Sequence, residues 1–302
     1  MSSTSRLPAV LDHLRSHRDF MSNVVAWERF PARRARTAPV THALQPALRH
    51  ALQVRGLADF YLHQATAIDA ALGGENVVVA TATASGKTLC YNVPVLNAML
   101  QRPRARALYL FPTKALAHDQ EAELAGLLED GGLPVTVTTY DGDTPRHKRR
   151  LARQETQIVI TNPDMLHAGI LPFHTRWRDL FSALEYVVVD EIHAYRGVFG
   201  SHVANVLRRL RRLCRFYGSD PRFICCSATI ANPLEHAERL LEAPFTLVDE
   251  SQNGAPQGAK QFILYNPPLV DEVLGLRQSA ILAAKDAASS EAAASTEATA
   301  QE

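Results

Sequence analysis

Residues 81–88, TATASGKT in one-letter code, have the composition of a loop that binds phosphate. Small side chains let backbone N–H groups approach phosphate oxygens at the start of a helix. In this interpretation Lys87 reaches the β- and γ-phosphates of a nucleotide, and the hydroxyl of Thr88 binds Mg²⁺. We expect every residue of the loop to contact the nucleotide: Thr81, Ala82, Thr83, Ala84, Ser85, Gly86, Lys87 and Thr88. The loop departs from the general G-x-x-x-x-G-K-[ST] pattern at Thr81, which stands in place of the first glycine.

Two acidic residues, Asp190 and Glu191, follow the apolar run 187–189, about one hundred positions after Lys87. Asp190 would hold the Mg²⁺ shell, and Glu191 would orient and deprotonate an attacking water. The structural alternative is a strand that ends in a solvated acidic turn, but the phosphate loop upstream favours phosphoryl transfer. The sequence thus predicts Lys87, Asp190 and Glu191 as catalytic residues, and a nucleotide with Mg²⁺ as cofactors.

These residues need a scaffold, and seven short runs rich in β-branched and other apolar residues provide it. The runs are mostly uninterrupted rather than alternating, which is typical of strands that are buried on both faces of a parallel sheet. Helical patterns such as 114–128 and 202–216 lie between them, so we expect an α/β fold with a doubly wound, mostly parallel seven-stranded sheet. Ligands bind beyond the carboxyl ends of such strands. The runs are 77–80, 107–111, 135–139, 158–161, 186–190, 223–226 and 245–248.

The flanks divide the chain into three expected parts. Residues 1–56 read as a helical N-terminal extension, with helices near 8–18 and 45–54 joined by a connection that contains Arg and Pro. Residues 57–250 form the sheet domain. Residues 251–302 begin with a loop, continue into a strand candidate at 261–265, and end in an Ala-rich stretch that we read as frayed helix or disorder.

The composition is that of a globular protein, because 46% of the 302 residues are hydrophobic and 21% are charged. A formal charge of +1 gives no argument for nucleic acid from the whole chain, although residues 271–302 carry a net −4 and residues 1–270 a net +5. The four cysteines form no C-x-x-C pair, so we expect neither a disulfide framework nor a zinc site. No secretory signal or long apolar run is visible, which predicts a cytoplasmic protein without a membrane partner.

The order of the motifs resembles that of superfamily-two helicases of the DEAD/DEAH-box type. The box here reads Asp-Glu-Ile-His at 190–193. Four further segments resemble motifs of this family in the same order: 60–64 the Q motif that reads adenine, 112–116 motif Ia, 161–164 the motif Ib region, and 227–229 motif III. The resemblance implies a RecA-like lobe of the P-loop NTPase type.

Roles for further residues follow from this resemblance. Tyr61 and Gln64 would bind the base, since an amide can donate to and accept from an adenine edge at once. The implied nucleic-acid contacts are Pro112, Thr113, Lys114, Asp141, Thr161 and Asn162. Four residues are implied to couple the state of the bound ATP to binding of the nucleic-acid strand: His193, Ser227, Ala228 and Thr229.

Structural alternatives stay open for several of these residues. Thr161 and Asn162 fit helix caps, and Lys114 fits a solvated side chain. The basic stretches 146–153 and 208–215 fit charged helix faces as well as contacts with nucleic acid.

A narrower resemblance concerns one helicase branch. Trp27-Glu28 with the Arg-rich stretch after it, residues 139–145 and residues 265–268 are similar to the branch with the bacterial mitomycin-repair helicase and the fungal RecQ-four-like helicase. This implies an ATP-dependent DNA helicase of DNA repair that moves 3′ to 5′. Ala82 stands where that branch leads us to expect Gly, which affects the expected geometry of the loop.

The same resemblance implies a second RecA-like lobe that carries an arginine finger, and this chain ends about 34 residues after Pro268. We therefore expect the chain by itself to bind nucleotide weakly and to hydrolyse it very slowly. Nucleic acid is the expected partner, with DNA favoured over RNA. Two alternatives remain: the lobe of an RNA helicase or duplex translocase, and a truncated module that binds nucleotide or nucleic acid without turnover.

Overall fold

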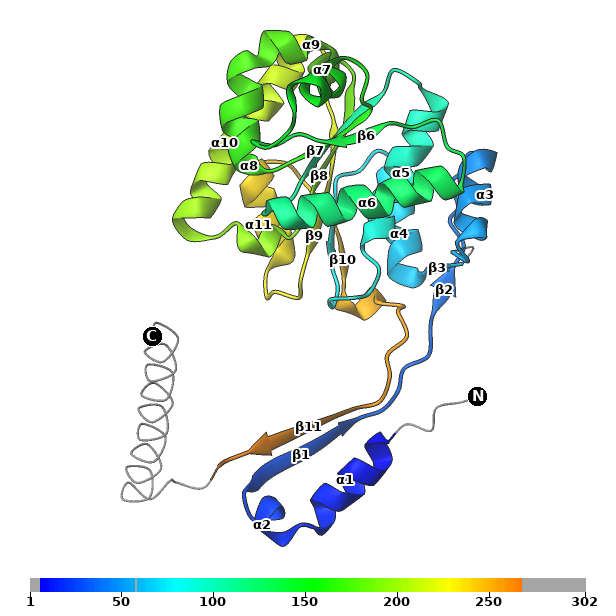
Figure 1. The fold of residues 1–302 in the computed structure, drawn as a ribbon, viewed down its shortest axis with the longest axis vertical. Helices are drawn as coiled ribbons and strands as arrows, with labels where there is room; N and C mark the ends of the chain where they lie inside the picture. The colour runs from blue at the N-terminus through cyan, green and yellow to red at the C-terminus, as the bar shows by residue number, and fades with distance from the viewer. Residues whose placement is uncertain (1–5, 58, 268–302) are drawn as a thin grey trace, which may run out of the picture. The chain divides into compact units, whose positions relative to one another are not determined.

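The computed structural model describes residues 6–57 and 59–267, which fall into two units (Figure 1). Residues 33–257 belong to the larger unit, and the described residues before 33 and after 257 belong to the smaller one. The Ala-rich stretch lies outside the described residues. No helix within the described residues is long and apolar enough to cross a membrane.

The larger unit is built on a sheet of seven parallel strands in the order β10-β4-β9-β8-β5-β7-β6. Each predicted apolar run overlaps one of these strands, and the bounds differ by up to two residues, so the predicted α/β fold is confirmed. The strands are β4 (Val77–Ala80), β5 (Arg106–Leu110), β6 (Val137–Thr139), β7 (Ile158–Thr161), β8 (Leu184–Val189), β9 (Arg222–Ser227) and β10 (Thr246–Asp249).

Helices cover both faces of the sheet because successive strand residues point to opposite sides. In β7, Ile158 and Ile160 belong to one apolar cluster and Val159 to the other. The first cluster is closed by α3 (Pro46–Val54), α4 (Leu62–Leu72), α5 (Thr88–Gln101) and α6 (Lys114–Asp130). The second is closed by α7 (Arg146–Gln154), η1 (Leu166–Ile170), η2 (Leu171–Trp177), α9 (Arg178–Ser182), α10 (Gly197–Tyr217) and α11 (Pro233–Leu241).

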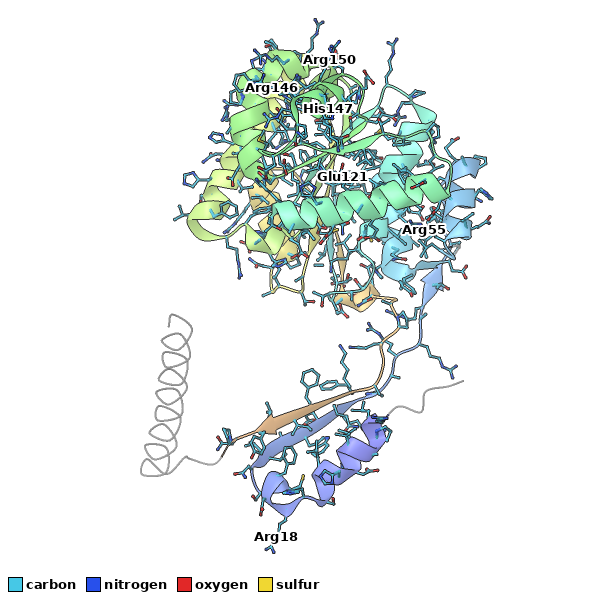
Figure 2. All side chains as sticks on the ribbon, viewed as in Figure 1. Arg18, Arg55, Glu121, Arg146, His147 and Arg150 are labelled. Carbon is cyan, nitrogen blue, oxygen red and sulfur yellow. The ribbon has the colours of Figure 1, made fainter. Side chains whose placement is uncertain are left out.

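Residues 33–57 contribute to the larger unit. Thr37–Ala38 (β2) pairs antiparallel with Phe60–Tyr61 (β3), and α3 buries three apolar side chains in the first cluster. At the end of α3, Arg55 Nε donates to Asp130 Oδ2 over 2.8 Å (Figure 2). This segment was expected to belong to a helical extension, but α3 is part of the core because its apolar face needs a partner.

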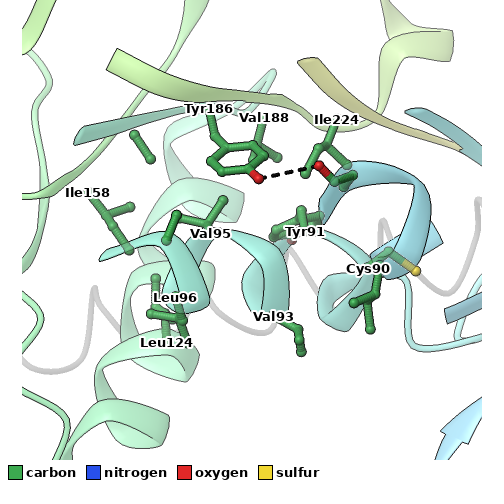
Figure 3. Packing of buried hydrophobic residues seen from close by; sticks show 14 of the residues in the cluster. Cys90, Tyr91, Val93, Val95, Leu96, Leu124, Ile158, Tyr186, Val188 and Ile224 are labelled. Carbon is green, nitrogen blue, oxygen red and sulfur yellow. Dashed lines mark hydrogen bonds between the residues drawn. The ribbon is translucent and has the colours of Figure 1, made fainter. Parts of the chain in front are cut away.

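Helix α5 lies between the sheet and α6, so its side chains from Cys90 to Met99 are buried. Figure 3 shows Tyr91 and Val95 of α5 against Val188 and Ile224 of the sheet, with Leu124 of α6 among the packed side chains. This packing fixes the first turn of α5, which carries the end of the phosphate loop.

The smaller unit contains a strand that the sequence did not reveal. Val24–Phe30 (β1) pairs antiparallel with Lys260–Tyr265 (β11), and Trp27 Nε1 donates to Gln261 Oε1 over 2.7 Å. The expectation of a plain connection between two helices is therefore wrong for residues 24–30. Leu7–Ser16 (α1) fits the first expected helix, and Arg18–Met21 (α2) follows it. The partner of β1 lies more than 200 positions downstream, where no local pattern could indicate it.

Candidate functional site

The phosphate loop connects the end of β4 to the start of α5, as its sequence predicts. Lys87 Nζ donates to the carbonyl oxygens of Thr81 and Ala82 over 2.9 and 3.1 Å. The hydroxyl oxygens of Thr81 and Ser85 lie 2.8 Å apart, and both residues are buried. The ammonium group is thus held inside the loop, where a phosphate would meet it.

Gly86 is the one position of this loop where glycine is required. Its φ is +81°, and a Cβ atom there would lie 2.7 Å from Gln64 Nε2. That nitrogen donates to the Gly86 carbonyl oxygen over 2.9 Å, while Gln64 Oε1 accepts from the N–H of Tyr61 over 2.9 Å. Ala84 also has a positive φ, +59°, a conformation that costs an alanine roughly 1 kcal/mol.

Gln64 bonds to the backbone on both sides of its amide. The side chain is 2% exposed. In this state it joins Tyr61 to the phosphate loop, and one N–H and one oxygen lone pair of the amide are not used by these two bonds.

Asp190 follows β8, and its carboxylate is held on both sides. Oδ1 accepts from the N–H of Glu191 over 2.7 Å, and Oδ2 lies 3.3 Å from the hydroxyl of Tyr91. Burial raises the pKa of Asp190 to about 6, and the neighbouring carboxylate of Glu191 adds to the rise. The Tyr91 hydroxyl also contacts the side chain of Thr88.

Oxygen atoms of Thr88 and Asp190 therefore meet around one tyrosine hydroxyl. Mg²⁺ prefers such oxygen ligands and retains several waters, so this donor set fits the ion.

Glu191 has a carboxylate oxygen without a donor. Its Oε2 is buried and has no hydrogen bond from the described residues, although it lies 3.0 Å from His193 Nδ1. The same nitrogen accepts from the N–H of Ala228 over 3.1 Å, and a nitrogen that accepts carries no proton to give to Glu191. The backbone of Glu191 is left-handed, with φ +52°, which turns the side chain off the strand direction. A general base for a water would use such an unpaired carboxylate oxygen.

The residues expected to couple the state of ATP to binding of the nucleic-acid strand lie after β8 and at the end of β9, which are neighbours in the sheet. The hydrogen bond from Ala228 to His193 joins the segment after β9 to Ile192–Ala194 (η3). Ser227 is fully buried, and its hydroxyl has no partner among the described residues. Thr229 is exposed.

The expected nucleic-acid residues follow the strands β5 and β7, which lie side by side. Thr113 Oγ1 accepts from the N–H of Leu116 at the start of α6, and Asn162 Oδ1 accepts from the N–H of Met165. Lys114 Nζ pairs with Asp143 Oδ2 over 2.6 Å, and Pro112 is partly exposed. The buried hydroxyl of Thr161 donates to the Tyr140 carbonyl oxygen over 2.6 Å. Thr113 and Asn162 therefore cap helices in this state.

Asp141 is the expected contact that the structure turns inward. It is 2% exposed, and its Oδ1 accepts from the N–H of Asp143 and the hydroxyl of Thr144. Its Oδ2 lies 3.1 Å from His118 Nε2. Burial alone would raise the pKa of Asp141, but these hydrogen bonds and His118 lower it below its usual value. The carboxylate therefore shapes the turn 140–145 and is turned away from solvent.

Two residues of the site escaped the sequence analysis. Tyr91 lies three positions after Thr88 on one helix, and the i, i+3 spacing could have revealed it. Glu250, after β10, accepts from the N–H of Ala82 over 2.9 Å and lies 3.6 Å from Arg33. No sequence signal places β10 beside β4, so Glu250 could not have been found.

Comparisons with known proteins agree with this geometry. Residues 61–237 match the DEAD/DEAH box helicase family. The chain is 54% identical over 258 residues to the uncharacterized ATP-dependent helicase YprA of Bacillus subtilis, covering 85% of this chain and 34% of YprA. It is 38% identical over 278 residues to the ATP-dependent helicase HRQ1 of Saccharomyces cerevisiae, covering 90% of this chain and 25% of HRQ1.

Solved structures give a similar result. The crystal structure of the DUF1998 helicase MrfA bound to DNA and AMPPNP matches with a TM-score of 0.83 and 52% identity, over 88% of this chain and 36% of that one. The DEAD-box helicase Mss116 bound to ssRNA and UDP-BeF, at 18% identity and a TM-score of 0.58, shares the fold alone; 69% of this chain and 43% of that one are covered. The chain thus spans about a third or less of the lengths of YprA and HRQ1.

Proposed function

Since this chain belongs to the DEAD/DEAH box helicase family, we propose that it is the ATP-binding lobe of an ATP-dependent helicase that unwinds DNA during repair. It binds ATP with Mg²⁺ and one strand of nucleic acid. A second RecA-like lobe, outside this chain, completes the motor. The direction of movement is 3′ to 5′, as the branch resemblance implies.

One observation carries the proposal: Lys87 follows β4, and Asp190 and the carboxylate of Glu191 follow β8, at the carboxyl edge of one sheet in which only β9 separates these two strands. The ammonium of Lys87 leaves the loop carbonyls and binds the phosphates. Thr88 and Asp190 hold Mg²⁺, which supplies positive charge to the phosphate oxygens. Glu191 takes a proton from the water that attacks the terminal phosphate.

Three relatives support ATP as the nucleotide. YprA and HRQ1 are named ATP-dependent helicases, and MrfA was crystallised with DNA and AMPPNP. The MrfA complex also favours DNA over RNA for this chain. The RNA-bound Mss116 shares too little sequence to support an RNA substrate.

Strand displacement by the intact protein tests the proposal. Duplexes of DNA and of RNA, each with a 3′ or a 5′ overhang, should separate the possibilities. We expect ATP-dependent displacement of DNA with a 3′ overhang, and none after Lys87→Ala. Equal activity on RNA would favour the RNA helicase instead, and nucleotide binding without any displacement or hydrolysis would favour a binding module.

A further inference from the structure

A groove with positively charged walls lies beside the loops that follow β6 and β7. One wall is α7, and the other is formed by η1 and η2. The groove has a volume of about 470 Å³. Among the residues that line it are Arg146, Arg153, Phe173 and Arg176, with Tyr140 and Trp177 below them.

The floor of this groove is rigid. The rings of Tyr140 and Trp177 are buried and meet edge to face, with centroids 4.7 Å apart. Arg149 lies over the Tyr140 ring and donates to the carbonyl oxygens of Thr144 and Gly142, so this arginine is committed to the turn 140–145.

The walls carry cations that the protein does not neutralise. No acidic residue occurs in 144–154 or in 165–178. Within the described part of the chain, Arg146, Arg153 and Arg176 have no ion pair, and Arg176 lies 5.5 Å from the ring of Phe173, which is 48% exposed. Figure 2 shows Arg146 and Arg150 together around α7, which carries five cations in nine residues.

We propose that this groove binds the phosphate backbone of a nucleic-acid strand and that Phe173 stacks on one of its bases. Free arginines suit phosphates, and an exposed ring beside a guanidinium suits a base. An acidic protein segment would satisfy the arginines but would leave the ring without a partner.

Continuity with the proposed strand path supports the same occupant. The α7 wall begins directly after the turn 140–145, where Asp143 pairs with Lys114. The other wall follows Asn162 by three residues. A strand that crosses Lys114 and Asn162 therefore meets the segments that lead directly into the two walls of the groove. The inference rests on the proposed function, because it extends the contact with the strand that the helicase would pull.

The test is binding of a fluorescent single-stranded DNA to the 302-residue chain across a range of salt concentrations. Arg153→Ala/Arg176→Ala removes one cation from each wall, so the slope of log affinity against log salt should fall by about 1.4, and the affinity at low salt by about tenfold or more. Phe173→Leu keeps an apolar residue but removes the ring, so affinity should fall about fivefold or more with an unchanged slope.

Arg49→Ala/Arg104→Ala is the matched control, since it removes the same charge from exposed residues outside the groove. Circular dichroism establishes that all variants fold. If the groove variants bind DNA like the control, the inference is overturned while the proposed function stands, and the arginines would then suit an acidic protein partner. If the wild-type chain binds no DNA, the inference about the groove and the proposed function are both contradicted.

Discussion

Glu191 has a carboxylate oxygen that no donor reaches, which is the state a general base needs before a water arrives. Glutamine keeps the shape of this side chain and removes its basicity. In the intact protein, Glu191→Gln should abolish ATP hydrolysis and leave ATP affinity within about threefold. Steady-state turnover and equilibrium binding of a fluorescent ATP analogue measure the two effects. Equal loss of both would refute the role of Glu191 as the base.

His63, beside Gln64, reports on the packing under the phosphate loop. It is fully buried, and burial lowers its pKa from 6.5 to about 4. At a pH between about 4 and 6.5, His63 takes up a proton in the unfolded chain but not in the folded chain. The free energy of unfolding therefore decreases as the pH falls through this range.

His63→Gln removes that titration. The variant should have a lower free energy of unfolding than wild type at pH 7. This deficit should be smaller at pH 5 by about 2 kcal/mol. Urea unfolding at the two pH values measures the difference, with the exposed His50→Gln as the control. An identical loss at both values would mean that His63 already takes a proton in the folded state.

At the scale of elements, α5 connects the carboxylate of Asp190, which we propose to be catalytic, to the helix that starts the proposed nucleic-acid surface. The hydroxyl of Tyr91 lies 3.3 Å from Asp190 Oδ2 and 3.0 Å from Gln120 Oε1 of α6. The first residue of α6 is Lys114. One buried hydroxyl thus touches the ATP site and the element that would meet the strand.

Tyr91→Phe keeps the ring and removes this link. In the intact protein, the ratio of DNA-stimulated to basal ATPase activity should fall severalfold, with a loss of about 1 kcal/mol in stability. Tyr109→Phe is the control, because that hydroxyl bonds to Asn92 in the same core and its loss should cost similar stability without changing the ratio. An unchanged ratio in Tyr91→Phe would rule out the coupling.

The sequence predicted elements well where burial dictated their composition. The inner strands of the large sheet are mostly apolar and buried on both faces, whereas the edge strands β6 and β10 contain Thr and are partly exposed. Strand order is a different matter: nothing local places β10 beside β4, which brings Glu250 to the phosphate loop. The motif residues were found by type and spacing, whereas the engagement of Gln64 and Asp141 by their own neighbours depends on tertiary contacts.

At the scale of the whole molecule, the chain covers 34% of YprA and 36% of MrfA. The proposed motor therefore needs parts outside these 302 residues, and an arginine finger contributes about 10³ to 10⁵ in rate. By itself the chain should bind nucleotide weakly, hydrolyse it very slowly and fail to translocate. A steady-state ATPase assay with and without DNA, beside the intact protein, checks this. Brisk DNA-stimulated turnover by the isolated chain would contradict it.

The pairing of β1 with β11 has a consequence for synthesis on the ribosome. Phe30 is opposite Lys260, and Val24 is opposite Tyr265. At about 5–20 residues per second, β1 waits on the order of 10–50 s before its partner emerges. During that time its backbone edge and exposed side chains such as Val25 and Phe30 are open to other chains. The nascent protein therefore has an interval in which this strand lacks its partner and its backbone groups are unpaired.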